Sequence, residues 1–237
     1  MHRIKIYQSK RHVIVTALFI VIPFVFLLLF AQLSNIASAK LAIDVSSSLT
    51  RIALAYFVAA FLGWFFAVLF YKGKRAIIAL PIFDVLQSFP TFAALPIATM
   101  IWGPNNFTII FFLVLAIIWP VFFSVISSMK LIKREWEEAV EVYQLSKIDY
   151  LRKFLLPVSI PGLITGSIVG MGDGWEALIA TEIIVGIKTG LGSFFQFFSA
   201  NTNMTALGIL GFLLIIFTIN KLIWLPLLNW GHQKMEE

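Results

Sequence analysis

Long apolar stretches dominate this chain and decide what it can fold into. Six of them lie at residues 13–33, 47–71, 77–102, 107–129, 158–185 and 205–230, with only isolated ionisable side chains inside them. An α-helix rises about 1.5 Å per residue, so about 20 apolar residues cross the hydrocarbon core of a bilayer. The sequence therefore predicts an all-α polytopic membrane protein, with six transmembrane helices in a single membrane domain over residues 1–237.

The composition excludes several other classes of protein. Hydrophobic residues make up 60% of the chain and charged residues 13%, against about 25% charged residues in an ordinary soluble domain. The chain has no cysteine, which excludes a disulfide scaffold, a thiolate metal site and a cysteine nucleophile. Its three histidines, His2, His12 and His232, lack metal-ligand spacing. We therefore expect no catalytic residue and no metal site, and a membrane enzyme is the least favoured reading.

The basic residues indicate how the chain is oriented. Most of the 18 Lys and Arg lie at 3–11, 72–75, 130–153 and 234, on one side of the predicted spans, and Lys40, Arg51 and Lys188 lie on the other. The positive-inside rule then places both termini in the cytoplasm. Because orientation accounts for the net charge of +6, we expect membrane lipid around the chain and no nucleic-acid partner. The first apolar stretch is too long for a secretory signal, although residues 37–39 offer a cleavage-like triplet.

The hydrophilic segment 130–157 is the only sizeable one and is predicted to be cytoplasmic. Trp136, Ala139, Val140 and Tyr143 recur at i, i+3, i+4 and i+7, which predicts a short amphipathic helix. Further on, Ser146 and Asp149 have the spacing of a capping box that opens a second short helix, which Pro157 should close. We expect two helices outside the membrane, with a joint at residues 144–146.

Two explanations of the apolar face of this segment stay open. The face either docks on a partner protein or lies against the lipid headgroups. No phosphate-binding glycine loop occurs in the chain, since residues 71–75 lack the spaced glycine and the Ser or Thr after Lys. Active transport by this chain would therefore draw its energy from a partner or from an ion gradient.

The same segment resembles the EAA loop of permease subunits of binding-protein-dependent ATP-binding-cassette (ABC) importers. The shared residues are Glu138-Ala139-Val140, then Gln144, then Leu156-Pro157 with Pro161-Gly162 after them. Val140 stands where the family has a second alanine, and Gln144 stands where it has glycine. Glutamine at the joint makes a left-handed turn costlier than glycine would.

The resemblance implies a set of partners and a fold. The fold would be that of a type I ABC importer permease, in the inner membrane of a prokaryotic cell. Two ATPase subunits, which bind ATP and Mg²⁺, would grip the coupling residues Trp136, Glu138, Ala139, Val140, Tyr143, Gln144 and Pro157. An extracytoplasmic binding protein would deliver the solute, and a second permease copy or a related subunit would complete the pathway. This chain would bind no cofactor itself.

Other residues resemble the nitrate/sulfonate/taurine branch of that family. They include Ser48-Leu49-Thr50-Arg51, Leu86-Gln87-Ser88-Phe89-Pro90, Ala180-Thr181-Glu182 and Thr189-Gly190-Leu191-Gly192. The branch implies an oxyanion or a small organic acid, such as nitrate, a sulfonate or taurine, as the solute. A permease for a cationic or neutral solute and a gradient-driven carrier remain as alternatives.

The fifth apolar stretch carries a row of small residues. Gly162, Gly166, Gly170 and Gly174 recur every four residues and form a ridge without side chains on one helix face. Such a ridge lets another helix approach closely. We predict that it packs against a helix, or that it forms a sliding surface between the two halves of a transporter.

The same stretch holds the carboxylates that we predict for the solute pathway. Asp173 and Glu176 lie one turn apart beside Trp175, and Glu182, which matches the family's glutamate, lies two turns further on. Carboxylates inside a membrane usually face a cavity or a partner. The stretch is longer than the hydrocarbon core, so we predict a break at residues 172–174 that opens a cavity. These carboxylates would repel an anionic solute unless a basic residue or a proton compensates.

Overall fold

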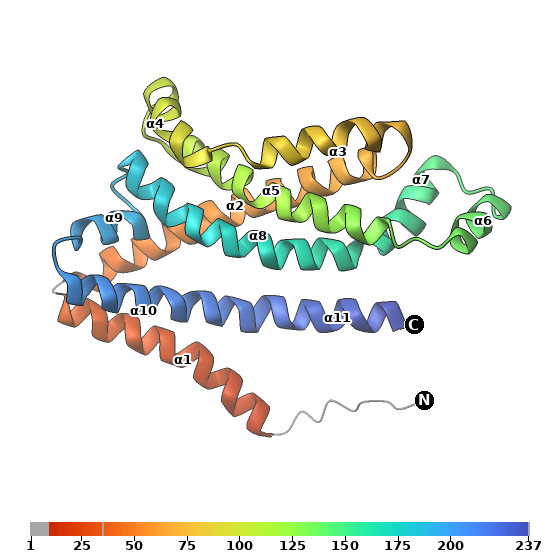
Figure 1. Cartoon of the computed structure of the whole chain (residues 1–237). Helices are drawn as coiled ribbons and strands as arrows, with labels where there is room; N and C mark the ends of the chain where they lie inside the picture. The colour runs from red at the N-terminus through yellow and green to blue at the C-terminus, as the bar shows by residue number, and fades with distance from the viewer. Residues whose placement is uncertain (1–9, 35, 237) are drawn as a thin grey trace.

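The computed structural model describes residues 10–34 and 36–236 as a bundle of helices (Figure 1). No strand occurs among these residues. The helices are α1 (Lys10–Leu33), α2 (Ser38–Phe70), α3 (Gly73–Gln87), α4 (Thr91–Trp102), α5 (Asn106–Met129), α6 (Arg134–Val142), α7 (Lys147–Asp149), α8 (Leu156–Val185), α9 (Leu191–Phe197), α10 (Thr202–Ile219) and α11 (Leu225–Glu236). Two π-helical segments, η1 (Tyr150–Leu155) and η2 (Asn220–Trp224), join α7 to α8 and α10 to α11.

The helix lengths confirm an all-α polytopic membrane protein but not the number of spans. Four uninterrupted helices in the described part are long and apolar enough to cross a membrane: Ser38–Phe70, Asn106–Met129, Lys147–Val185 and Thr202–Gly231. The bent pair α3–α4 is long and apolar enough to count as a fifth membrane span only when the two helices are taken together. Within α1, the described residues contain the apolar segment Val21–Leu33, which is shorter than the four helices named above. The first of the six predicted spans therefore stays a prediction.

The core lies where α2, α5 and α8 pack together along the middle of the bundle. α5 is buried on several sides, and Leu113, Ile117 and Val121 have no exposed surface. α5 is apolar along its whole length because its neighbours on both flanks are other helices of the chain. A smaller cluster joins α1 to α9 through the edge-to-face contact of Phe30 with Phe194, whose ring centroids lie 5.3 Å apart. The α2–α5–α8 core is thus the frame on which the other elements are mounted.

The predicted third span, 77–102, is not a straight helix. α3 and α4 meet at an angle of 79° at a break of three residues that ends in Pro90. Proline disfavours helical backbone at the residue before it and has no N–H of its own, so the helix ends ahead of Pro90. The second span also differs, because α2 begins at Ser38 and not at residue 47. An ion pair of Lys40 with Asp44, 3.4 Å between Nζ and Oδ2, lies in this amino-terminal extension of the helix.

The predicted break at residues 172–174 is wrong, because α8 runs without interruption from Leu156 to Val185. The irregular backbone lies instead in η1 and η2, each just before a proline, Pro157 and Pro226. A proline offers no N–H to the carbonyl four residues earlier, and that carbonyl falls inside the π-helical segment in both cases. Pro157 therefore does not close a separate helix: α7, η1 and α8 follow one another directly.

The two ends of the bundle carry different elements (Figure 1). α6 and α7 project from one end, and the carboxyl end of α11 lies at that same end. α9 and the loop that leads into it lie at the opposite end. The basic residues Arg3 and Lys5, which support the predicted orientation, lie outside the described residues.

Candidate functional site

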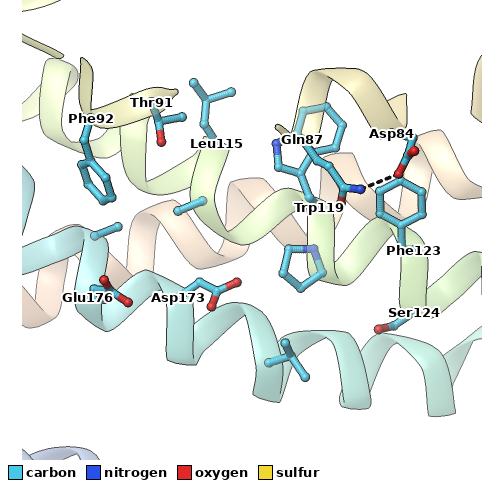
Figure 2. A pocket seen from close by; sticks show the side chains of 14 residues that line it. Asp84, Gln87, Thr91, Phe92, Leu115, Trp119, Phe123, Ser124, Asp173 and Glu176 are labelled. Carbon is cyan, nitrogen blue, oxygen red and sulfur yellow. Dashed lines mark hydrogen bonds between the residues drawn. The ribbon is translucent and has the colours of Figure 1, made fainter. Parts of the chain in front are cut away.

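A groove with acidic and aromatic walls opens between the α3–α4 pair and the α5–α8 pair (Figure 2). Its volume is about 540 Å³. α8 contributes Asp173 and Glu176, α3 contributes Asp84 and Gln87, and α5 contributes Trp119. The other lining residues are Thr91, Phe92, Leu115, Ala116, Pro120, Phe123, Ser124, Val169 and Ala177.

The carboxylates give this groove a negative charge. Asp173 and Glu176 point from α8 into the same space, while Asp84 faces it from α3 and accepts a hydrogen bond from Gln87, 2.6 Å from Nε2 to Oδ1 (Figure 2). No Lys or Arg lines the groove, and in the described part of the chain no basic group pairs with Asp173 or Glu176. These two residues thus border a cavity, as predicted, although no broken helix creates it. Their role in a solute pathway stays a prediction.

Glu182 does not line the groove, contrary to the prediction from sequence. Its side chain has no exposed surface and forms an ion pair with Arg51 of α2, 2.5 Å from Oε1 to Nη1. The Ser48 hydroxyl donates to the same carboxylate at 2.8 Å, and the Gly192 backbone N–H donates at 2.8 Å. Each oxygen of the carboxylate is therefore satisfied by donors within the chain, which leaves none free for a solute.

Arg51 extends this buried network to two further elements. Its Nε donates to Asn106 at the start of α5, 2.9 Å away, and Nη1 donates to the Thr189 carbonyl, 2.8 Å away. Nη2 donates to the Thr189 hydroxyl at 3.0 Å. A buried charge pair is tolerated only when its remaining donors and acceptors are also satisfied, and here they are. The network ties α2, α5, α8 and the loop before α9 into one unit.

Trp175 is the second predicted pathway residue that the structure places elsewhere. It is buried and packs edge to face against Phe212 of α10, with ring centroids 5.7 Å apart. Its indole N–H has no hydrogen-bond partner among the described residues. In a helix of 3.6 residues per turn, Trp175 points about 100° away from Glu176, which explains why adjacent residues reach different surroundings.

The glycine ridge packs against α5 of the same chain. A Cβ atom at Gly162 would lie 2.5 Å from the Ser124 carbonyl oxygen, and one at Gly166 would lie 2.7 Å from the Val121 Cα. A Cβ at Gly170 or Gly174 would lie 2.9 Å from atoms of Ile117. The prediction of close helix packing is confirmed. The alternative, a sliding surface between two halves of a transporter, is wrong because α5 already covers the ridge.

The segment 130–157 contains the predicted amphipathic helix as α6. Lys133 precedes α6 in extended backbone, and a turn at Tyr143 and Gln144 follows the carboxyl end of α6. Gln144 has φ of +47°, the left-handed conformation that the joint was expected to need. Ser146 then caps α7 by accepting a hydrogen bond from the Asp149 N–H at 3.2 Å, which confirms the predicted start of the second short helix. The Asp149 carboxylate accepts a hydrogen bond from the Ser146 hydroxyl, 2.8 Å from Oγ to Oδ2.

α6 exposes much of its apolar face. Tyr143 is 78% exposed and Trp136 46%, Ala139 is also exposed, and Val140 is half-buried. On the polar face Glu138 accepts a hydrogen bond from Arg134, 2.8 Å from Oε1 to Nε, and both side chains face solvent. Exposed Tyr and Trp side chains together form an apolar patch that is typical of interaction surfaces.

One ion pair connects α6 to the loop between α2 and α3. Lys72 Nζ lies 3.1 Å from Glu137 Oε1, and the hydroxyl groups of Tyr71 and Tyr150 lie 2.9 Å apart beside them. Partial burial by itself lowers the pKa of Lys72, but hydrogen bonds with Tyr71 and Glu137 outweigh it, so the net pKa is raised. Lys72 therefore carries its charge throughout the physiological pH range.

A family model matches most of the chain. It is the model described as "Binding-protein-dependent transport system inner membrane component", and it matches residues 59–223. The chain belongs to this family. The match covers α3 to α10, so it includes the groove and α6. The predicted family and the predicted class of membrane transport component, as opposed to an enzyme, are thereby confirmed.

Three proteins that are similar to this chain have names that describe transport. The chain is 32% identical over 152 residues to the nitrate import permease protein NrtB of Leptolyngbya laminosa, covering 64% of this chain and 54% of NrtB. It is 30% identical over 149 residues to the bicarbonate transport system permease protein CmpB of Synechococcus elongatus, covering 62% and 54%. It is 31% identical over 153 residues to the taurine transport system permease protein TauC of Escherichia coli, covering 64% and 55%. The chain thus spans about half the length of each of these three relatives.

Two features of the family member were missed by reasoning from sequence. Asp84 was not among the predicted pathway residues, yet it lines the groove opposite Asp173. Trp119 gave no signal at all, because an apolar residue in an apolar stretch does not show which way it faces. The basic residue that compensates Glu182 is Arg51. The described residues contain no cluster of acidic or histidine side chains that could hold a metal ion.

Proposed function

We propose that this chain is a permease subunit of an ATP-driven importer and forms part of the path by which a small solute crosses the membrane. The observation that carries the proposal is α6, a short amphipathic helix that projects from one end of the bundle with Trp136 and Tyr143 exposed. An isolated helix of nine residues would be marginal in water, so its ordered presentation points to a docking role. Family membership of residues 59–223 supports the same role.

The energy source in this proposal is a separate ATPase. Two ATPase subunits bind ATP and Mg²⁺ and grip α6 of each permease subunit. The aromatic side chains of α6 fill a groove on the ATPase, and burying such a side chain contributes about 1.5–3 kcal/mol. The pathway is completed by a second permease subunit, either a copy of this chain or a relative, and a binding protein delivers the solute from outside.

The proposed orientation places α6 and both termini in the cytoplasm of a prokaryotic cell, with the chain in the inner membrane. The basic residues near α6 support it by the positive-inside rule. The carboxyl end of α11, which lies at the same end of the bundle as α6, supports it as well. α9 and the Arg51–Glu182 network then lie on the side from which the solute arrives.

The names of the relatives support a small oxyanion or organic acid as the solute. NrtB, CmpB and TauC are named for nitrate, bicarbonate and taurine. The groove favours the other candidate, a cationic or neutral solute, because the unpaired carboxylates of Asp173 and Glu176 repel an anion. The two candidates make opposite predictions for neutralising these carboxylates, which are developed in the Discussion.

Co-purification with an ATPase tests the proposal. The chain is expressed with the ATPase of its own transport system, and the complex is isolated in detergent before and after Tyr143→Asp. We expect the unmodified chain and the Tyr143→Phe control to retain the ATPase and Tyr143→Asp to release it, since a charge cannot fill an apolar groove. Retention of the ATPase by Tyr143→Asp would contradict docking through α6. Uptake driven by a proton gradient without any ATPase would support a gradient-driven carrier instead.

A further inference from the structure

A second groove opens between the carboxyl end of α2 and the first half of α3. Its volume is about 380 Å³, and it shares no lining residue with the acidic groove of Asp173. Five apolar residues and one cation line it: Phe70, Ile78, Ala79, Ile82, Phe83 and Arg75. We call this space the α2–α3 groove.

The aromatic wall of the α2–α3 groove is held by the core of the bundle. Phe83 packs edge to face on Phe70 of α2, with ring centroids 5.3 Å apart. It packs in the same way on the buried Phe122 of α5, with ring centroids 4.8 Å apart. Ala79 beside this wall contributes only a methyl group, which leaves the space next to the rings open. The groove is therefore preformed between well-anchored helices.

The lining residues of α3 lie on one face of that helix. Arg75, Ile78, Ala79 and Ile82 recur at i, i+3, i+4 and i+7. Seven residues of α-helix span about 10 Å, so a cation stands at one end of an apolar strip of that length. Ile78 and Ile82 are both exposed, which means that the described residues leave the strip uncovered.

Arg75 has no counter-charge within the described part of the chain. None of the five ion pairs found there includes it. Arg75 and Lys74 lie in the first turn of α3, which contains no acidic residue. The positive end of the helix dipole lies in that turn and disfavours cations. An anion bound from outside the chain would therefore be stabilised by Arg75 and would offset an unfavourable arrangement within α3.

The position of α3 places Arg75 at a boundary of the membrane. The amino end of α3 lies at the end of the bundle that carries α6 (Figure 1), and the ion pair of Lys72 with Glu137 joins the two, 3.1 Å from Nζ to Oε1. Because α6 is hydrophilic, this end faces water, and the apolar strip runs from it toward the hydrocarbon. Arginine at such a boundary reaches the headgroups, and basic pockets between membrane helices bind anionic headgroups.

We infer that the α2–α3 groove binds one phospholipid with an anionic headgroup, of the kind that phosphatidylglycerol carries. The Arg75 guanidinium donates two parallel hydrogen bonds to the phosphate, a geometry that suits this side chain. One acyl chain lies along Ile78, Ala79 and Ile82 and covers the exposed strip. The inference needs only the membrane location of the chain, so it stands apart from the proposed docking of an ATPase.

A lipid titration tests the inference. The full chain, isolated in a neutral detergent with the subunits that it retains, is titrated with phosphatidylglycerol or with phosphatidylcholine of the same acyl chains. Native mass spectrometry measures the bound lipid. We expect Arg75→Gln to weaken phosphatidylglycerol binding about fivefold, the equivalent of about 1 kcal/mol for one basic residue beside anionic lipid. Arg75→Lys should keep most of the binding, and phosphatidylcholine should bind more weakly to the unmodified chain.

Two neighbours of the lining residues serve as matched controls. Lys74→Gln removes the same charge as Arg75→Gln, but Lys74 does not line the groove. Ile77 is 75% exposed and Ile78 67%, yet only Ile78 lines the groove. We expect Ile78→Ser to weaken binding of both lipids, about fourfold for each methylene group that leaves the contact, and Ile77→Ser to change it little. Equal losses in Lys74→Gln and Arg75→Gln, or in the two serine variants, would indicate a diffuse surface and overturn the inference.

A free anion is one competing occupant. Glycerol 3-phosphate carries the charge of the headgroup without acyl chains, so at the same concentration it should not displace phosphatidylglycerol. Displacement by glycerol 3-phosphate or by inorganic phosphate would assign Arg75 to a site for small anions and overturn the inference.

A second copy of the chain is the other competing occupant. The chain has no native cysteine, so Ile78→Cys introduces a single thiol. In native membranes we expect this thiol to react with a maleimide carried on a phospholipid headgroup and to form no disulfide between two copies. A disulfide-linked dimer of this variant would assign the groove to a protein interface and overturn the inference.

Discussion

Arg51 and Glu182 form a fully buried ion pair although 131 residues separate them in the sequence. The pair joins α2 to α8, and its remaining hydrogen bonds reach α5 and the loop before α9. Asp44 adds a further anchor by accepting the Gly190 N–H at 3.0 Å. The end of the bundle opposite α6 is therefore held by polar contacts, whereas its middle is held by apolar packing.

The first prediction concerns this ion pair. Glu182→Gln leaves the buried Arg51 charge without a counter-charge, and breaking a buried pair by removing one partner costs about 3–5 kcal/mol. We expect the thermal unfolding temperature of the purified chain in detergent to fall clearly. Replacing both residues, as in Arg51→Met with Glu182→Met, should recover part of that loss because no unpaired charge stays buried. A variant Glu182→Gln as stable as the unmodified chain would show that water reaches this site.

The second prediction uses two glycines of one helix as a matched pair. Gly166→Ala places a Cβ 2.7 Å from the Val121 Cα, so α5 and α8 must move apart, at a cost of about 1–3 kcal/mol. Gly172→Ala meets no atom within 4 Å and should stabilise the helix by about 1 kcal/mol. Thermal unfolding of the two variants measures both effects. Equal stability of the two variants would mean that α8 does not pack on α5 through this ridge.

The elements that the sequence predicted well are those with a simple period or a local signal. The helix Asn106–Met129 matches the predicted fourth span, because a long apolar stretch with no ionisable residue predicts a transmembrane helix. The cap at Ser146 and the amphipathic pattern of α6 depend only on neighbours in sequence, and both were found where expected. The four-residue glycine repeat identified a packing face but not which helix would cover it.

The errors came from positions whose surroundings depend on distant residues. Glu182 and Asp173 are both carboxylates of the same helix. Glu182 is buried in an ion pair with Arg51, whereas Asp173 borders the groove. Nine residues separate them, which turns the second about 180° from the first around the helix, and only the tertiary arrangement fixes the environment of each face. Gly172 and Gly174 were read as a break, although in lipid glycine serves helix packing as readily as it permits a bend.

The third prediction concerns the joint after α6. Gln144 adopts a left-handed conformation, which costs a residue with a Cβ about 1–2 kcal/mol. Gln144→Gly should therefore raise the stability of the segment, partly offset by the greater freedom of glycine in the unfolded chain. Hydrogen exchange of the α6 amides is the suitable measurement, because it reports local opening. Gln144→Val serves as the opposite case and should speed exchange. Protection of the α6 amides from hydrogen exchange should increase in the order Val, Gln, Gly at position 144. A reversed order would contradict the left-handed conformation of this residue.

The fourth prediction concerns access to the groove. A cysteine replacing Asp173 should react with a water-soluble thiol reagent in at least one nucleotide state, since Asp173 lines the cavity and no native cysteine competes. Thr181→Cys in the same helix is the control: Thr181 is fully buried, so this variant should stay unlabelled. Labelling of both positions would mean that α8 is loosely packed. Protection of position 173 in every state would exclude Asp173 from the pathway.

The last prediction uses the same carboxylates to identify the charge of the solute. Asp173→Asn with Glu176→Gln keeps the shape of the groove and removes two negative charges that have no basic partner. Two like charges 4 Å apart repel each other by about 1 kcal/mol even in bulk water, and by more in a groove with apolar walls. Uptake of an anionic solute should therefore rise in the double variant, and uptake of a cationic solute should fall. Equal uptake by both forms would show that the solute does not pass these two side chains.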